Sequence, residues 1–197
     1  PLPTAVNAVI PAVLAGNAVI IKHSPRTPLC AMHFARAFEE AGAPPGAVSA
    51  IFLDYENTEK LVGDPRIDAV LFTGSVLGGH KIQAAAKDRF IQVGLELGGN
   101  DPAYAAEDCD VAKTVENVVD GAIYNAGQSC CAVERVYVHR NVYDAFIAAA
   151  EPLVRAYVLG DPLDDKTSLG CIAQPWHAKE LQALVDDAVK KGAKLVA

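Results

Sequence analysis

Short runs of apolar, largely branched residues constrain the fold of this chain more than any other feature. They occur at residues 18–22, 48–53, 69–72 and 90–95, and segments with helix signals separate them. Each run is apolar on both faces, which is typical of strands in a covered parallel sheet. Repeated alternation of strand and helix predicts right-handed crossovers in an open parallel, Rossmann-like α/β sheet, whose ligands bind at the carboxyl ends of the strands.

Signals at helix ends support this alternation. Thr27 and Pro28 are typical of an N-cap and a first-turn proline, and they predict a helix over residues 29–41. Gly42 follows at the position where a left-handed cap ends many helices. Asn57 is the expected cap of the next helix.

The pattern changes after Asn100. The predicted elements there are a helix, a strand and two more helices, at residues 110–125, 135–139, 141–159 and 175–191. We therefore expect a boundary at Gly98–Gly99, with part of a second α/β domain after it. The apolar stretch at residues 5–21 is interrupted by polar residues and turn formers, so we expect a buried helix and strand there instead of a membrane span.

Composition argues against nucleic-acid partners and metal sites, and it indicates a compartment. Acidic residues number 24 against 17 Lys and Arg, and the net charge of −7 lacks the basic excess that binding nucleic acid requires. The five cysteines and five histidines show no CxxC, HExxH or other ligand spacing, so no metal site is expected. Free cysteines without a disulfide pattern favour a reducing, cytoplasmic compartment.

Two segments in the first half could contact a nucleotide. Phe72-Thr73-Gly74-Ser75 ends an apolar run and begins a helical segment, so backbone N–H groups there could face a phosphate. An ordinary strand-to-helix turn explains the segment equally well, because it is not a GxGxxG motif. Lys22 ends the first run, where its ammonium could donate to ribose hydroxyls or be simply solvated.

Two further segments carry reactive groups. In Leu95-Glu96-Leu97-Gly98-Gly99, a carboxylate stands among apolar residues, where desolvation would suit it to act as a general base. Glu96 is therefore either paired with another group or held in place for function. Gly127-Gln128-Ser129-Cys130-Cys131 puts two thiols on a connecting segment, beside a glycine turn and a glutamine amide. The other two thiols that precede this segment, Cys30 and Cys109, are expected to be inert and buried.

Taken together, these four segments resemble the aldehyde dehydrogenase superfamily in their order and separation. The resemblance covers the whole chain, and the family's full-length subunit is more than twice as long, so we expect a middle fragment. It implies that Cys130, the cysteine of the GQxC motif, is the nucleophile, and not Cys131. It also implies that Glu96, the glutamate of the ELGG motif, is the general base.

The resemblance implies a reaction and a cofactor. The Cys130 thiolate attacks the aldehyde to give a thiohemiacetal, hydride passes to NAD(P), and water activated by Glu96 hydrolyses the thioester. The matching cofactor-binding positions are Lys22 at the adenosine ribose, Gly74 and Ser75 near the pyrophosphate, and Leu97.

The chain departs from the family pattern near that ribose. Pro25 stands where the family has a ribose-binding glutamate. We expect NAD as the cofactor, with NADP as the alternative. Pro1 matches the proline of a W-N-x-P motif, so the oxyanion-hole asparagine is expected just before this chain. A nicotinamide-binding glutamate and an oligomerisation strand are expected beyond Ala197, in a parent protein that is a homo-oligomer.

The resemblance thus predicts an NAD(P)-binding domain over residues 1–98 and the N-terminal part of a catalytic domain over residues 99–197. The predicted reaction is oxidation of a small-molecule aldehyde to a carboxylic acid. A branch that passes the thioester to coenzyme A is the first alternative, although that branch commonly lacks the base matched by Glu96. An inactive nucleotide-binding module is the second. Semialdehydes, lactaldehyde and aliphatic aldehydes all remain open as substrates.

Overall fold

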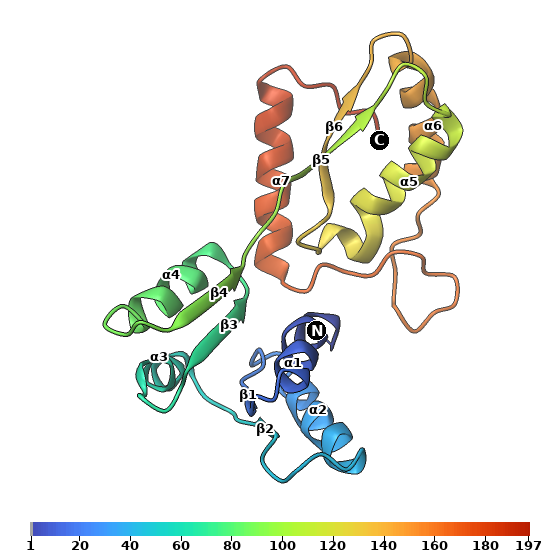
Figure 1. Cartoon of the computed structure of the whole chain (residues 1–197). Helices are drawn as coiled ribbons and strands as arrows, with labels where there is room; N and C mark the ends of the chain where they lie inside the picture. Colours follow the sequence, from blue (N-terminus) through green and yellow to red (C-terminus); the bar gives the residue numbers. More distant parts are fainter. Residues whose placement is uncertain (1) are drawn as a thin grey trace. The chain divides into compact units, whose positions relative to one another are not determined.

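A computed structural model describes residues 2–197, and the chain divides into two compact units, with the boundary in the sequence between Gly98 and Gly99. Figure 1 shows the helices and strands of both units along the chain. All paired strands within the described residues run parallel, which confirms the predicted α/β class. Pro1, which the sequence aligns with the W-N-x-P motif, lies outside the described residues.

The first unit begins with two helices and a parallel strand pair. These elements are α1 (Leu2–Leu14), β1 (Val19–Ile21), α2 (Leu29–Glu40) and β2 (Val48–Ala50). Val19 lies opposite Val48 in the pair. A small core joins the helices to the strands because Val9 of α1, Ile21 of β1 and Ala31 of α2 are buried together.

The second half of this unit repeats the arrangement. Its elements are α3 (Tyr55–Gly63), β3 (Ala69–Thr73), α4 (Val76–Ala85) and β4 (Gln92–Glu96). Helices α3 and α4 pack together and cover the strands from one side (Figure 1). The core here is formed by Val62, Ile82 and Ala86, the last of these directly after α4.

The strands differ from the prediction in their extent and burial. Within residues 2–197 they form three separate two-stranded sheets, whereas the sequence pattern predicted one open sheet. In β3, Val70 and Phe72 pack on the core, whereas Leu71 on the opposite face is 56% exposed. Helices of this unit therefore cover one face of the pair, which leaves the other apolar face open.

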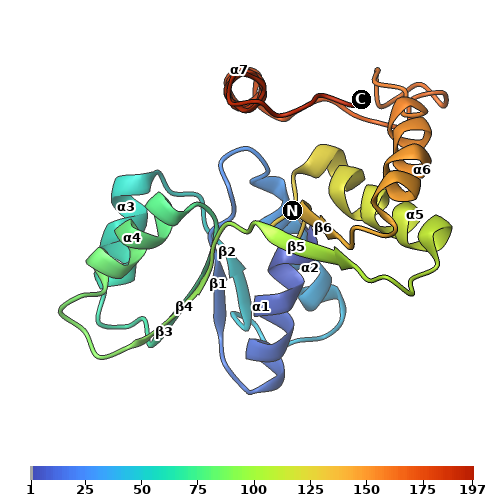
Figure 2. The same cartoon turned by 90° about the horizontal axis from the view of Figure 1, so that it is seen from above.

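The second unit is built around α5 and α6. Its elements are β5 (Asp101–Ala105), α5 (Val111–Ile123), the 3-10 turn η1 (Tyr124–Gly127), β6 (Val133–Val138), α6 (Tyr143–Arg155) and α7 (Pro175–Lys190). Helices α5 and α6 lie side by side next to the parallel β5–β6 pair (Figure 2). Val115 and Val119 of α5 meet Phe146 of α6 and Ala105 of β5 in its core. Helix α7 has no buried residue.

Two predicted helix caps were wrong. The Thr27 hydroxyl lies 3.0 Å from His23 Nδ1 and makes no capping bond to α2. The cap of α3 is Asp54, whose carboxylate accepts a 2.8 Å hydrogen bond from the Asn57 N–H. Asp54 takes this role because it precedes the first helical residue, whereas Asn57 is already inside the helix. The left-handed residue after α2 is confirmed, with φ of 83° at Gly42.

The second unit also holds elements that differ from the prediction. Strand β5 was missed, since Pro102 within it cannot donate to a ladder and argues against a strand. Helix α6 ends at Arg155, four residues short of the predicted end. Beyond the helix, Leu159 forms an isolated parallel bridge with Leu169 instead of continuing it.

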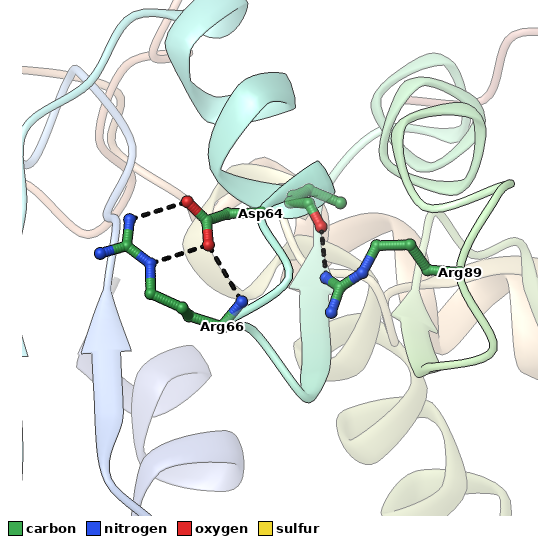
Figure 3. Close-up of polar contacts among 4 residues, drawn as sticks. Asp64, Arg66 and Arg89 are labelled. Atoms are coloured by element: carbon green, nitrogen blue, oxygen red, sulfur yellow. Dashed lines mark hydrogen bonds and ion pairs between the residues drawn. The ribbon is translucent and has the colours of Figure 1, made fainter.

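A charged turn joins α3 to β3. The Asp64 carboxylate accepts hydrogen bonds from the Arg66 side chain, at 2.9 Å from Nε and 2.8 Å from Nη2, and from the Arg66 backbone N–H at 3.0 Å (Figure 3). These hydrogen bonds from Arg66 hold the pKa of the Asp64 carboxyl well below its usual value. Arg89 joins the end of α3 to this turn, because it donates to the Val62 carbonyl at 3.1 Å and also to the Ile67 carbonyl.

Candidate active site

The carboxyl ends of β3 and β4 bring two predicted motifs together. Thr73 is paired with Glu96 in the parallel ladder, and the Gly74 N–H donates to the Glu96 carbonyl oxygen at 3.0 Å. Gly74, Ser75 and Glu96 therefore share one edge of this strand pair. This is the edge at which ligands bind in open α/β sheets.

Ser75 begins α4 at this edge. Its Oγ accepts a 3.1 Å hydrogen bond from the Gly78 N–H, so the side chain is an N-cap. The next N–H groups, of Val76 and Leu77, have no acceptor among residues 2–197, and no acidic residue occupies the first turn. Free N–H groups at a helix N-terminus attract anions, so the arrangement fits a phosphate.

Gly74 and Leu97 shape the packing around the start of α4. A Cβ placed on Gly74 would lie 2.6 Å from Cζ of Phe72, so glycine makes room for that ring. Leu97 follows β4, and its Cδ2 lies 2.8 Å from where a Cβ on Gly79 of α4 would be. Leu97 thus packs closely on the helix whose N-terminus faces the strand edge.

Lys22 directly follows β1, whereas the sequence predicted it as the last residue of that strand. Its side chain is half-buried, and its Nζ lies 5.5 Å from the centre of the Tyr55 ring in a cation–π contact. No hydrogen bond or ion pair within residues 2–197 joins Lys22 to Gly74 or Ser75. The ammonium is therefore held by an aromatic ring and keeps its hydrogen-bond donors available.

Glu96 is exposed, contrary to the expected burial among apolar neighbours. Leu95 packs toward the core on one side, and the Glu96 side chain points away from it, because successive strand residues face opposite sides. The described part of the chain gives the Glu96 carboxylate no ion pair or side-chain hydrogen bond. The described residues thus provide no partner for the Glu96 carboxylate, and its functional role stays a prediction.

Cys130 and Cys131 are exposed on the segment between η1 and β6. The Ala132 N–H donates to the Ser129 carbonyl at 3.2 Å and closes a turn around both thiols. Gly99 packs against this turn, since a Cβ on Gly99 would overlap the Cys130 carbonyl oxygen. Within the second unit, the end of the ELGG motif thus touches the cysteine of the GQxC motif.

The other cysteines have different surroundings. Cys30 and Cys109 are partly buried, and Cys109 packs against the core of the second unit. Cys171 is exposed and lines an open apolar hollow of about 600 Å³ with Gly127, Gly170 and their neighbours. No motif in the sequence predicted this hollow, and the small residues around Gly127 and Gly170 are the one sequence feature that accompanies it among the described residues.

The described residues contain neither a metal-binding cluster nor a membrane-spanning helix. Among residues 2–197, no group of three or more His, Cys, Asp or Glu residues is placed to hold a metal ion. No helix in this part of the chain is long and apolar enough to cross a membrane.

Comparison with known proteins decides the family. A sequence model of the aldehyde dehydrogenase family matches residues 1–197. The chain belongs to this family. The resemblance that the four motifs indicated is therefore confirmed.

Relatives within the aldehyde dehydrogenase family are similar over the whole chain. A succinate-semialdehyde dehydrogenase [NADP(+)] of Mycolicibacterium paratuberculosis is 36% identical over 195 residues, which are 99% of this chain and 41% of that protein. A protein of the same name from Deinococcus radiodurans is 36% identical over 100% of this chain and 41% of its own length. This chain thus spans about two fifths of the length of such relatives.

Solved structures have the same fold. Lactaldehyde dehydrogenase from Escherichia coli matches with a TM-score of 0.90 and 34% identity, over 98% of this chain and 41% of that one. A 3,6-anhydro-L-galactose dehydrogenase structure matches with a TM-score of 0.88 and 32% identity, over 96% of this chain and 40% of that one. The helices and strands described above are therefore those of a family member.

Proposed function

We propose that this protein oxidises an aldehyde to a carboxylic acid, with NAD(P) as the hydride acceptor and Cys130 as the nucleophile. Family membership supports the reaction. The observation that carries the assignment to Cys130 is its exposed thiol, on a turn that packs against Gly99 of the ELGG motif. In this proposal the unit up to Gly98 binds the cofactor, and the unit from Gly99 is the N-terminal part of the catalytic domain.

Cys130 performs the first covalent step. Its thiolate attacks the aldehyde carbon, a carbon–sulfur bond forms, and the carbonyl oxygen becomes an alkoxide. The Cys130 backbone N–H, which has no acceptor within residues 2–197, is available to stabilise that oxygen. Loss of hydride from this thiohemiacetal restores the C=O bond and leaves a thioester on Cys130.

Glu96 performs the second step. Its carboxylate removes a proton from water, and the resulting hydroxide attacks the thioester. The carbon–sulfur bond then breaks, the acid leaves, and Cys130 returns as a thiolate. Its carboxylate is exposed and has no ion pair or side-chain hydrogen bond within residues 2–197, so it is free to contact such a water molecule.

The residues proposed to hold NAD(P) are Lys22, Gly74, Ser75 and Leu97. The free N–H groups at the start of α4 fit a pyrophosphate, and the Lys22 ammonium fits ribose hydroxyls. When bound, the cofactor supplies the hydride acceptor. Pro25 removes the carboxylate that would repel a 2′-phosphate, so the stretch around Lys22 admits NADP as well as NAD.

Cofactor binding can be tested directly by calorimetric titration with NAD and with NADP. Lys22→Met keeps the length of the side chain and removes the ammonium, so it should weaken binding of either nucleotide about tenfold. Lys87→Met, after α4, is the matched control and should leave both affinities unchanged. Equal affinities in wild type and Lys22→Met would refute the ribose-binding role.

The substrate, compartment and assembly are also part of the proposal. Names of the relatives point to succinate semialdehyde and lactaldehyde as the first aldehydes to test. The net charge of −7 supports a protein without nucleic-acid partners. We further propose a cytoplasmic homo-oligomer without a membrane partner, as the free thiols and the family resemblance suggest.

The nucleophile is tested by alkylation with iodoacetamide, followed by peptide mass spectrometry. Cys130 should react faster than Cys30 and faster than its exposed neighbour Cys131, and an aldehyde should protect it. Cys131 is the internal control for exposure alone. If Cys130 reacts no faster than Cys30, its assignment as nucleophile is wrong.

The general base is tested on an acyl adduct. An activated acetate ester should acetylate Cys130, and loss of the acetyl group is followed by intact mass. Glu96→Gln should slow this loss about 100-fold, within the range of general-base effects. Glu180→Gln on α7 is the matched control. Unchanged deacylation in Glu96→Gln would refute the role, and acceleration of the loss by coenzyme A would favour the acylating branch.

A further inference from the structure

The segment before Cys130 has an unusual backbone. Asn125 (φ 55°, ψ 33°), Ala126 (φ 56°, ψ 37°) and Gly127 (φ 70°) are all left-handed. Asparagine and glycine tolerate this conformation, whereas in alanine the Cβ lies too close to the following carbonyl oxygen. Such a run persists only where surrounding contacts hold it, and these strained positions cluster at functional sites.

The Gln128 side chain supplies those contacts. Its Nε2 donates to the Asn125 carbonyl at 3.0 Å, and its Oε1 accepts from the Ala173 N–H at 2.8 Å. Asn125 returns a bond from its own Nδ2 to the Gln128 carbonyl at 3.1 Å. The amide orientation follows from the partners, since the reverse would place its NH₂ group against the Ala173 N–H and its oxygen against the Asn125 carbonyl.

These bonds join two distant parts of the second unit. Ala173 lies in the segment before α7, and the neighbouring Gly170 and Cys171 line the same hollow as Ala126 and Gly127. Gln128 therefore anchors the left-handed turn to a second segment. No side chain other than Gln128 makes a hydrogen bond between these two segments within residues 2–197.

The Cys130 backbone is consequently held from two sides. Gln128 fixes the chain two residues before it, and Gly99 packs against its carbonyl oxygen. The Gln128 amide bonds backbone groups at both ends, and no hydrogen bond joins it to the Cys130 thiol within residues 2–197. In this arrangement it acts on the thiol through the position of the backbone.

We propose that Gln128 is the positioning residue of the Cys130 turn: its amide joins Asn125 to Ala173 and thereby sets the backbone that carries the Cys130 thiol and N–H. This inference rests on the proposed role of Cys130 as nucleophile. Gln128 itself touches neither substrate nor cofactor in this assignment. Its loss should make Cys130 behave like an ordinary exposed thiol.

The first test compares alkylation of Cys130 and Cys131 by iodoacetamide, in the same molecules, between pH 6 and 9. Gln128→Met keeps the side-chain size and removes both hydrogen bonds. It should lower the Cys130 to Cys131 rate ratio about threefold to tenfold, the range expected for hydrogen bonds of this kind, and shift its pH profile toward that of Cys131. Gln182→Met, which removes a single exposed bond on α7, should leave ratio and profile unchanged.

Gln128→Glu gives a second variant of intermediate severity. A carboxylate still accepts from the Ala173 N–H, but its other oxygen repels the Asn125 carbonyl. The rate ratio should fall between wild type and Gln128→Met. A folded Gln128→Met with unchanged ratio and pH profile would overturn the proposal.

Amide hydrogen exchange keeps the proposal testable even if both variants unfold. In the wild-type chain, the Ala173 N–H should exchange at least about tenfold more slowly than an unprotected amide, because Gln128 accepts from it. Fast exchange there would refute the anchor. If Cys130 is no more reactive than Cys131 while the Ala173 N–H is protected, the nucleophile assignment fails and the anchor stands.

Discussion

Replacing Gly99 with alanine places a methyl group where the Cys130 carbonyl group lies. The added Cβ would stand 3.0 Å from the carbonyl carbon and overlap its oxygen. To reach the spacing of about 3.3 Å at which carbon and oxygen atoms meet in proteins, the oxygen must retreat by more than about 1 Å. A backbone group cannot rotate away as a side chain can, so the Cys130 turn has to move.

Two magnitudes follow from this displacement. Overfilling a packed contact costs about 1–3 kcal/mol, so the second unit should lose stability by that amount. A misplacement of about 1 Å at a reacting group can lower a rate about 100-fold. Gly99→Ala should therefore slow deacylation of the Cys130 acetyl adduct about 100-fold, a barrier change of about 2.7 kcal/mol that is similar in size to the expected loss of stability.

The assay follows urea unfolding by NMR signals of α5, together with formation and loss of the acetyl adduct by intact mass. Gly98→Ala is the matched control, because nothing lies within 4 Å of a Cβ at Gly98 and its φ is not left-handed. It should be neutral or slightly stabilising. Wild-type stability and wild-type adduct kinetics in Gly99→Ala would refute the packing of Gly99 on the Cys130 turn.

Three further predictions concern the stability of the units. Arg66 depresses the pKa of Asp64 in the folded state, so its contribution is present above the unfolded value of about 3.9 and is lost as pH falls further. Asp64→Asn should thus be less stable than wild type near pH 7, and the urea midpoints of the two proteins should converge in strong acid. A difference in midpoint that does not change with pH would refute the contribution of the Asp64 charge to stability. Val115→Ala, at a fully buried position, should cost about 2–3 kcal/mol in urea unfolding of α5, whereas exposed Val189→Ala should cost under about 0.5 kcal/mol. Ser75→Ala should lower the free energy of urea unfolding of α4 by about 1 kcal/mol, because it removes the hydrogen bond from the Gly78 N–H. Ser75→Asp should retain most of this stability, because its carboxylate can accept the same bond.

The sequence predicted those parts of the fold that depend on local pattern. The apolar runs located β1 to β4, and Pro175 marked the start of α7. Strand β5 could not be found in this way, because it contains Pro102 and is stabilised by β6, far along the chain. The cap of α3 was misassigned because both Asp54 and Asn57 have capping side chains, and only the helix start distinguishes them.

The candidate site likewise has features that the sequence predicted and features that only folding reveals. Motif order identified Cys130 and Glu96 as residues of interest, and parallel pairing of β3 with β4 explains why Ser75 and Glu96 share an edge. The contact of Gly99 with Cys130 and the bond from Ala173 to Gln128 join residues distant in sequence. No periodicity or spacing encodes such contacts, so they appear only once the chain is folded.

The separate cores have a consequence for cooperativity. Val9, Val62 and Val115 each belong to a different small cluster, and none of these clusters shares a buried residue with another. A domain with one core melts in an all-or-none transition whose calorimetric and van't Hoff enthalpies agree. This chain should instead absorb heat in overlapping transitions, with a calorimetric enthalpy above the van't Hoff value, so that no single melting temperature describes it.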